Sequence, residues 1–196
     1  GIANGAAFPV GTSTVTYTAT DAAGNTTILS FTVTVNDTEN PTIVGLPADI
    51  TQSNDAGQCS AVVSWTEPTP ADNCPGSTIA QTAGIANGAA FPVGTTTVTY
   101  TATDAASNTT SLSFTVTVND NEAPSIVGLP SNITQSNDAS LCSAVVSWTE
   151  PTAADNCPGS TIVQTSGIAN GAAFPVGTST VTYTATDAAG NTTTLS

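Results

Sequence analysis

The sequence has no Lys, Arg, His or Met, and its 14 acidic residues give a formal net charge of −14. Without an imidazole, no Ser-His-Asp or Cys-His mechanism can be assembled. Nucleic acid is excluded as a partner because neutralising phosphates requires Lys or Arg, and anionic membrane surfaces are excluded on the same ground. There is no run of about 18 apolar residues, so we expect no membrane insertion in this segment. We also predict that the segment is not an enzyme.

Hydrophobic residues nevertheless make up 39% of the chain, and they are patterned rather than scattered. Short runs rich in Thr and Val alternate polar and apolar residues, as in 95–103 and 111–118, and Gly and Pro punctuate them. This pattern is typical of half-buried strands, and no helical period appears beside it. We therefore predict an all-β fold.

An internal repeat organises the chain. The segment GIANGAAFPVGT begins at Gly1, Gly84 and Gly167, which sets a period of 83 residues, and residues 1–83 and 84–166 differ at 13 positions. Such a repeat predicts a tandem array of similar domains. We expect a piece of a longer array; strand donation from a neighbouring chain is the alternative explanation for the incomplete end repeats.

Two acidic segments, VNDTENPTI (35–43) and VNDNEAPSI (118–126), each follow an alternating run and are predicted to link the domains. The predicted domains are 1–36 (the C-terminal part of a repeat), 37–119 (a complete repeat) and 120–196 (a repeat lacking its last strand). About seven short strands per repeat predict tandem immunoglobulin-like β-sandwich domains. The predicted core aromatic residues are Trp65, Phe91, Tyr100, Phe114 and Trp148.

The four cysteines occur as two pairs with the same spacing: Cys59 with Cys74, and Cys142 with Cys157. One pair per repeat predicts a disulfide within each repeat, because the core of so small a domain is thin. Closing a loop of about 15 residues contributes about 3 kcal/mol. A redox or metal-binding pair is the alternative, although no basic residue is present to lower a thiol pKa.

Two residues beside the first cysteine pair suggest other functions. Trp65 is predicted to be a core residue, with a sugar-stacking platform as the alternative. Glu67 and Asp72 have the residue types of a glycosidase carboxylate pair. Both carboxylates recur unchanged in the next repeat and no cleft-forming insertion accompanies them. Catalytic use is therefore disfavoured.

The pattern Cys…Val-x-x-Trp-x-x-Pro…Asp-Asn-Cys, followed by FPVGTTTVTYTATD and FTVTV, resembles the HYR domain, or hyalin repeat. The resemblance implies an immunoglobulin-like sandwich, an extracellular or cell-surface location and a role in cell adhesion. Such repeats occur in animal extracellular proteins and in very large bacterial surface proteins. Near-identical copies without Lys or Arg look more like the bacterial arrays, including surface adhesins of gliding Bacteroidota.

This resemblance favours a structural stalk or filament segment that holds an adhesin away from the cell surface. The alternative is an array of modules that bind a glycan or protein weakly and gain by avidity. The expected partners are neighbouring repeats, further copies in a filament and a surface ligand of unknown identity.

Acidic residues gather in the linkers and in the turn of each last hairpin, and the second linker, NDNEAP, is similar to cadherin linkers. Calcium prefers six to eight oxygen ligands, which carboxylates and carbonyls supply. Calcium is thus the one candidate cofactor, and a solvated acidic linker is the alternative. The candidate ligands are Asp37, Glu39, Asp104, Asp120, Glu122 and Asp187.

Overall fold

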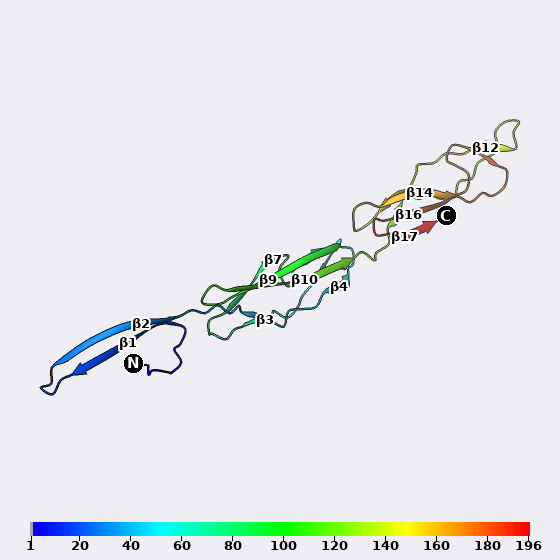
Figure 1. Ribbon diagram of the computed structural model, residues 1–196. Helices are drawn as coiled ribbons and strands as arrows, with labels where there is room; N and C mark the ends of the chain where they lie inside the picture. Colours follow the sequence, from blue (N-terminus) through cyan, green and yellow to red (C-terminus); the bar gives the residue numbers. More distant parts are fainter. Residues whose placement is uncertain (1) are drawn as a thin grey trace. The chain divides into compact units, whose positions relative to one another are not determined.

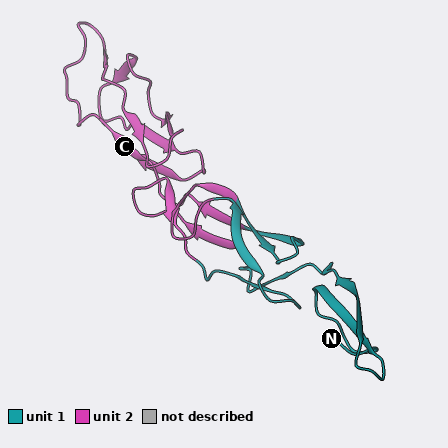
Figure 2. Cartoon of the chain, turned by 90° about the vertical axis from the view of Figure 1, so that its left-hand side faces the viewer, with its two compact units in different colours: residues 1–48, 65–84, 97–114 teal, residues 49–64, 85–96, 115–196 magenta. Residues whose placement is uncertain are grey.

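The computed structural model describes residues 2–196, and all regular elements in this range are β-strands (Figure 1). The predicted all-β class is confirmed. Among these residues there is no helix with the length and apolarity needed to cross a bilayer. The chain forms two compact units, teal and magenta in Figure 2: residues 1–48, 65–84 and 97–114 form the first, and residues 49–64, 85–96 and 115–196 form the second.

The first unit begins with a β-hairpin. Strands β1 (Gly11–Thr20) and β2 (Thr26–Val35) pair antiparallel along their whole length. Tyr17 and Phe31 stack with their ring centroids 6.4 Å apart, yet they remain 62% and 52% exposed. Their counterparts in the middle repeat are buried, because that repeat also supplies the strands that precede this hairpin in the sequence pattern.

The middle repeat contains eight strands. They are β3 (Thr42–Val44), β4 (Ile50–Ser53), β5 (Ser60–Val62), β6 (Thr69–Ala71), β7 (Thr78–Ala83), β8 (Ala90–Pro92), β9 (Gly94–Thr103) and β10 (Thr109–Asn119). In the first unit, β3 pairs with β6 and β7 pairs with β9, both antiparallel. In the second unit, β5 pairs antiparallel with β8, and the end of β10 runs parallel to β4.

Alternation along the long strands buries one side of each. In the first unit, Tyr100 of β9 and Phe114 of β10 are 2% and 3% exposed, and Trp65 packs edge-on against Phe114 with their ring centroids 5.2 Å apart. In the second unit, Phe91 of β8 is fully buried, as are Val63 and residues near the end of β10. Trp65 itself is only partly buried.

The third repeat lies entirely in the second unit. Its strands are β11 (Ser125–Val127), β12 (Ser143–Val145), β13 (Thr152–Ala154), β14 (Thr161–Ser166), β15 (Ala173–Pro175), β16 (Thr182–Thr186) and β17 (Thr192–Leu195). The pairs β11–β13 and β12–β15 repeat those of the middle repeat, and β14, β16 and β17 form a three-stranded sheet.

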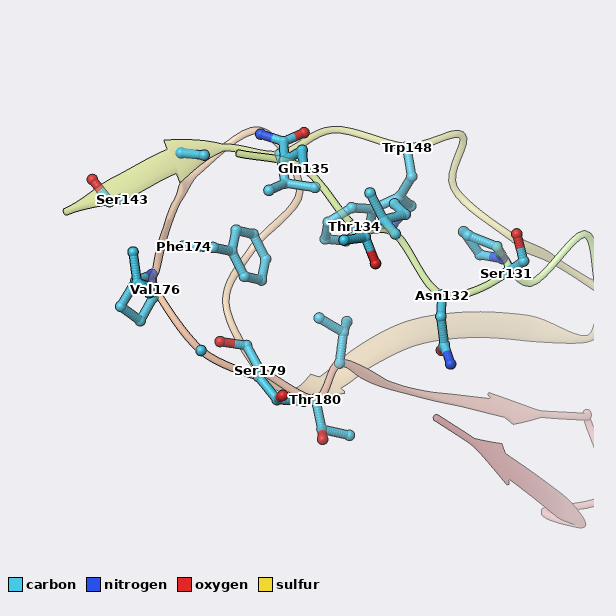
Figure 3. A pocket seen from close by; sticks show the side chains of 18 of the residues that line it. Ser131, Asn132, Thr134, Gln135, Ser143, Trp148, Phe174, Val176, Ser179 and Thr180 are labelled. Carbon is cyan, nitrogen blue, oxygen red and sulfur yellow. The ribbon is translucent and has the colours of Figure 1, made fainter. Parts of the chain in front are cut away.

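A cavity of about 860 Å³ opens in the third repeat, lined by Trp148, Phe174 and residues 129–137 (Figure 3). Ser196 is the counterpart of Ser113, so the end of β10 has no counterpart among these residues. Residues 133–136, the counterpart of β4, accordingly form no strand. We therefore assign the cavity to the position of the last strand of the repeat, and not to a ligand.

Candidate functional site at the junction between repeats

The linker that follows the middle repeat is hydrogen-bonded to a loop of that repeat. A carboxylate oxygen of Glu122 accepts bonds from the Gly57 N–H at 2.8 Å and from the Asn54 side chain at 3.3 Å. The Asn121 N–H donates to the Asn54 side-chain oxygen at 3.1 Å, and the Asn121 side chain donates to the Ser53 hydroxyl at 2.6 Å. Glu122 and Asn121 thus fix the start of the linker against loop 53–58.

The same loop also holds a turn of the third repeat. The side-chain nitrogen of Asn156 donates to the Gln58 carbonyl at 3.0 Å. Cys157 forms a disulfide with Cys59, across a Cα–Cα distance of 4.8 Å and a sequence separation of 98 residues. Asp155 shapes the turn by accepting the Cys157 N–H at 3.1 Å. A covalent bond therefore joins two consecutive repeats within the second unit.

This pairing shows that the prediction of a disulfide within each repeat is wrong. Cys59 lies in the loop that contacts the linker after its repeat, whereas Cys74 lies beside Asp37, in the linker before its repeat. Each repeat thus places its two cysteines at two different linkers, and spacing along the sequence did not reveal this. Cys74 and Cys142 are free thiols in this structure.

Each predicted turn acid clasps the linker that precedes its repeat. The Asn191 side chain donates to the Asp187 carboxylate at 2.8 Å and to the Asp120 carbonyl at 3.1 Å. Asp104, Asn108 and Asp37 make the same contacts 83 residues earlier. Burial raises the pKa of Asp104 and Asp187, but hydrogen bonds from the asparagine side chains and backbone outweigh it, so both pKa values lie below 3.8.

Two carboxylates and a sulfur atom meet at each junction. The ligand atoms of Asp37, Asp72 and Cys74 lie within 4.8 Å of one another, and so do those of Asp120, Asp155 and Cys157. A hydrogen bond to Asp37 raises the pKa of the Cys74 thiol, with burial and nearby negative charges adding to the effect. One Asp72 oxygen, Oδ1, is buried without a hydrogen-bond partner.

The predicted calcium ligands are only partly brought together. Asp37 and Asp120 each face a second carboxylate, from Asp72 and Asp155, which the sequence analysis had not assigned to calcium. The turn acids already bind asparagine side chains and backbone N–H groups, and Glu122 binds the preceding loop. Two carboxylates are fewer than the six to eight oxygens that calcium prefers. Calcium at the linkers stays a prediction, narrowed to these two pairs.

Titrating the oxidised chain with calcium in a calorimeter tests this prediction. Binding at the first pair is expected to be abolished by Asp72→Asn, because the unpartnered Asp72 oxygen is the available ligand there. Glu39→Gln, which changes an exposed side chain in the same linker, is expected to leave binding unchanged. A titration without heat, together with a thermal midpoint that does not respond to chelator, would rule calcium out.

Acid is expected to weaken the turn clasps. Because the pKa values of Asp104 and Asp187 are lower in the folded chain, their contribution to stability is present above pH 3.8 and is lost as pH falls through the folded values. Urea unfolding between pH 5 and pH 2.5 measures this loss. Asp104→Asn with Asp187→Asn should flatten the pH dependence, and Glu39→Gln should not.

The conserved spacing of Trp, Glu and Tyr in the two repeats has a structural explanation. The Trp65 indole N–H donates to the Tyr100 hydroxyl at 2.9 Å, and that hydroxyl donates to Glu67 at 2.6 Å. Burial and the bond to Glu67 raise the pKa of Tyr100. Trp148 and its partners repeat the chain of bonds. Glu67 is therefore used to complete a side-chain network, as is its counterpart.

Comparison with known proteins follows these features. The HYR domain matches residues 1–35, 36–118 and 119–195. Hyalin of Strongylocentrotus purpuratus is 42% identical over 190 residues, covering 94% of this chain and 16% of that protein. Hyalin of Lytechinus variegatus is 39% identical over 189 residues, covering 94% and 35%. The sushi, von Willebrand factor type A, EGF and pentraxin domain-containing protein 1 of Rattus norvegicus is 36% identical over 166 residues, covering 82% and 4%.

The fold and the repeated junction define a tandem array of immunoglobulin-like β-modules. The chain belongs to the HYR domain family. It is therefore a segment of an extracellular, adhesion-related repeat protein, and this family is non-enzymatic. The chain spans 35% or less of the length of each relative named above. Those relatives are animal proteins, so the likeness to bacterial arrays stays a prediction.

Proposed function

We propose that this segment is a structural spacer in an extracellular adhesion protein, holding an adhesive part away from the surface that anchors it. The supporting observation is the junction in the second unit, where a disulfide and several hydrogen bonds join consecutive repeats. The polar residues singled out from the sequence mostly serve turns, junctions or core networks. A spacer needs this kind of connection, because its task is to transmit position and force.

The alternative, a multivalent glycan- or protein-binding array, finds less support. Sugar recognition uses exposed aromatic faces, and the large exposed aromatic residues described here are Tyr17 and Phe31. Both belong to the incomplete first repeat, and their counterparts in the complete repeat are buried. The cavity in the third repeat matches a strand position. Roles in gliding, or in filaments of several chains, stay predictions of the family resemblance.

A deletion in the full-length adhesion protein tests the proposal. Removing residues 84–166 joins residue 83 to residue 167 and shortens the array by one period without disturbing the repeat pattern. A spacer is expected to lose about 30–40 Å of reach, from strands of about ten residues at 3.3 Å each plus loops, while ligand affinity stays unchanged.

The isolated 196-residue chain provides the control for this experiment. It should show no saturable binding to the cells or surfaces that the full-length protein recognises. Saturable binding that unlabelled chain competes away would overturn the spacer proposal in favour of a binding array. An affinity that falls with each deleted period would lead to the same conclusion, since avidity depends on the number of modules.

A further inference from the structure

We propose that the Cys59–Cys157 bond is one member of a continuous series, in which the strand cysteine of each repeat is linked to the turn cysteine of the next. Cys142 is then the site for the turn cysteine of a following repeat, and Cys74 the site for the strand cysteine of a preceding one. The argument rests on the repeat period and the contacts around each cysteine. It holds whatever the array presents at its end.

The loop around Cys142 already has the conformation of the loop around Cys59. The Asn137 side chain donates to the Leu141 carbonyl at 2.7 Å, as its counterpart does to Gln58 at 3.0 Å. Ser140 has a φ of 64°, close to the 69° of Gly57, although a left-handed backbone is unfavourable for serine. The third repeat thus keeps this unfavourable loop conformation, and Cys142 is exposed there.

The turn around Cys74 likewise matches the turn around Cys157. In each, the cysteine N–H donates to the aspartate two residues earlier, at 3.0 and 3.1 Å. The intervening asparagine side chain lies 3.6 Å from the sulfur in both. Both turns also meet an aspartate of the preceding linker. The two turns differ in one respect: Cys157 has the loop of a preceding repeat beside it.

Bond formation is an oxidation of two thiols. The thiols of Cys142 and of a following turn cysteine lose two protons and two electrons as the S–S bond forms. A soluble disulfide accepts them, its own S–S bond breaks and it leaves as two thiols. An extracellular setting supports this chemistry. The same exchange joins Cys74 to a preceding repeat.

The series has a mechanical consequence. Successive disulfide loops overlap, because Cys59 opens one loop before Cys74 closes the previous one. The shortest covalent path through a repeat is then the 15-residue step between these cysteines plus one disulfide, about 50 Å when extended at 3.3–3.6 Å per residue, against about 290 Å for the 83-residue period. An oxidised array gains little length even when its repeats unfold.

Peptide mapping of this chain, and of a version lengthened by one period, tests the inference. A second copy of residues 84–166 is inserted before Gly167, which adds one strand cysteine and one turn cysteine. Both proteins are refolded in a glutathione redox buffer, alkylated and cut before aspartate without reduction. The four cysteine peptides of the original chain are then 55–71, 72–103, 138–154 and 155–186.

In the original chain we expect 55–71 linked to 155–186, with 72–103 and 138–154 alkylated. In the lengthened protein, Ser179 marks the last turn peptide, since the first copy carries Thr96 at that position. The marked peptide is expected to be linked to the 138–154 sequence, and the unmarked one to 55–71. Linkage of 55–71 to 72–103, or an alkylated marked peptide, would overturn the inference.

Discussion

Replacing Cys59 and Cys157 together by Ser is expected to lower the free energy of unfolding of the second unit by about 4–5 kcal/mol, since closing a loop of about 100 residues constrains the unfolded chain by roughly that amount. The bond spans 98 residues, far more than the 15 that separate the cysteines within one repeat. Urea unfolding of the oxidised chain, followed by tryptophan fluorescence, measures the change. Reduction of the unsubstituted chain should reproduce it.

The variant with Cys74 and Cys142 both replaced by Ser is the matched control. It removes the same number of thiols, but neither residue is in a disulfide in this structure. Its stability should stay close to that of the unsubstituted chain. If bonds instead formed within each repeat, both double variants would lose the same two disulfides and be destabilised equally.

Phe91→Ala is expected to destabilise the middle repeat by about 3–5 kcal/mol, because truncating a buried Phe loses its burial and leaves a cavity. Phe91 is fully buried. It lies on the short strand β8, whose partner is β5, so its ring is one of the few large groups in a small core. A Trp148→Phe background leaves Trp65 as the fluorescent reporter of this repeat.

Phe174 is the counterpart of Phe91 one period later and provides the comparison. It is only partly buried and borders the cavity at the missing strand position. Phe174→Ala, read from Trp148 in a Trp65→Phe background, should therefore cost clearly less. Equal losses at the two positions would mean that the middle repeat has no better core than the third, against the burial described above.

Much of the fold was predictable from short-range pattern. Alternation in 95–103 and 111–118 predicted the two long strands, because a two-residue period places every second side chain on one face. The burial of Tyr100 and Phe114 follows the same rule. The repeat period predicted the modular organisation, because near-identical sequences form the same local contacts. The partial burial of Trp65 was not predictable, since it depends on the packing of a neighbouring aromatic ring.

The junction was harder to predict, because its contacts join residues distant in sequence. A spacing of 15 residues favoured a bond between Cys59 and Cys74, but it carries no information on which linker each cysteine approaches. The role of Asp72 was also missed; its signal was its place two residues before a cysteine in a repeated turn. The acidic linkers were identified correctly as junction segments, whereas their individual partners depended on the tertiary fold.

Pulling the oxidised chain by its two ends in a single-molecule force experiment tests the central claim most directly, namely that a covalent bond bridges consecutive repeats. The Cys59–Cys157 bond hides the chain between the two cysteines from the force, so the fully unfolded contour should lengthen by about 340 Å on reduction, at 3.3–3.6 Å per residue. Bonds within each repeat would hide only two 15-residue steps, about 100 Å in total. A gain near 340 Å supports the account, and a gain near 100 Å or none contradicts it.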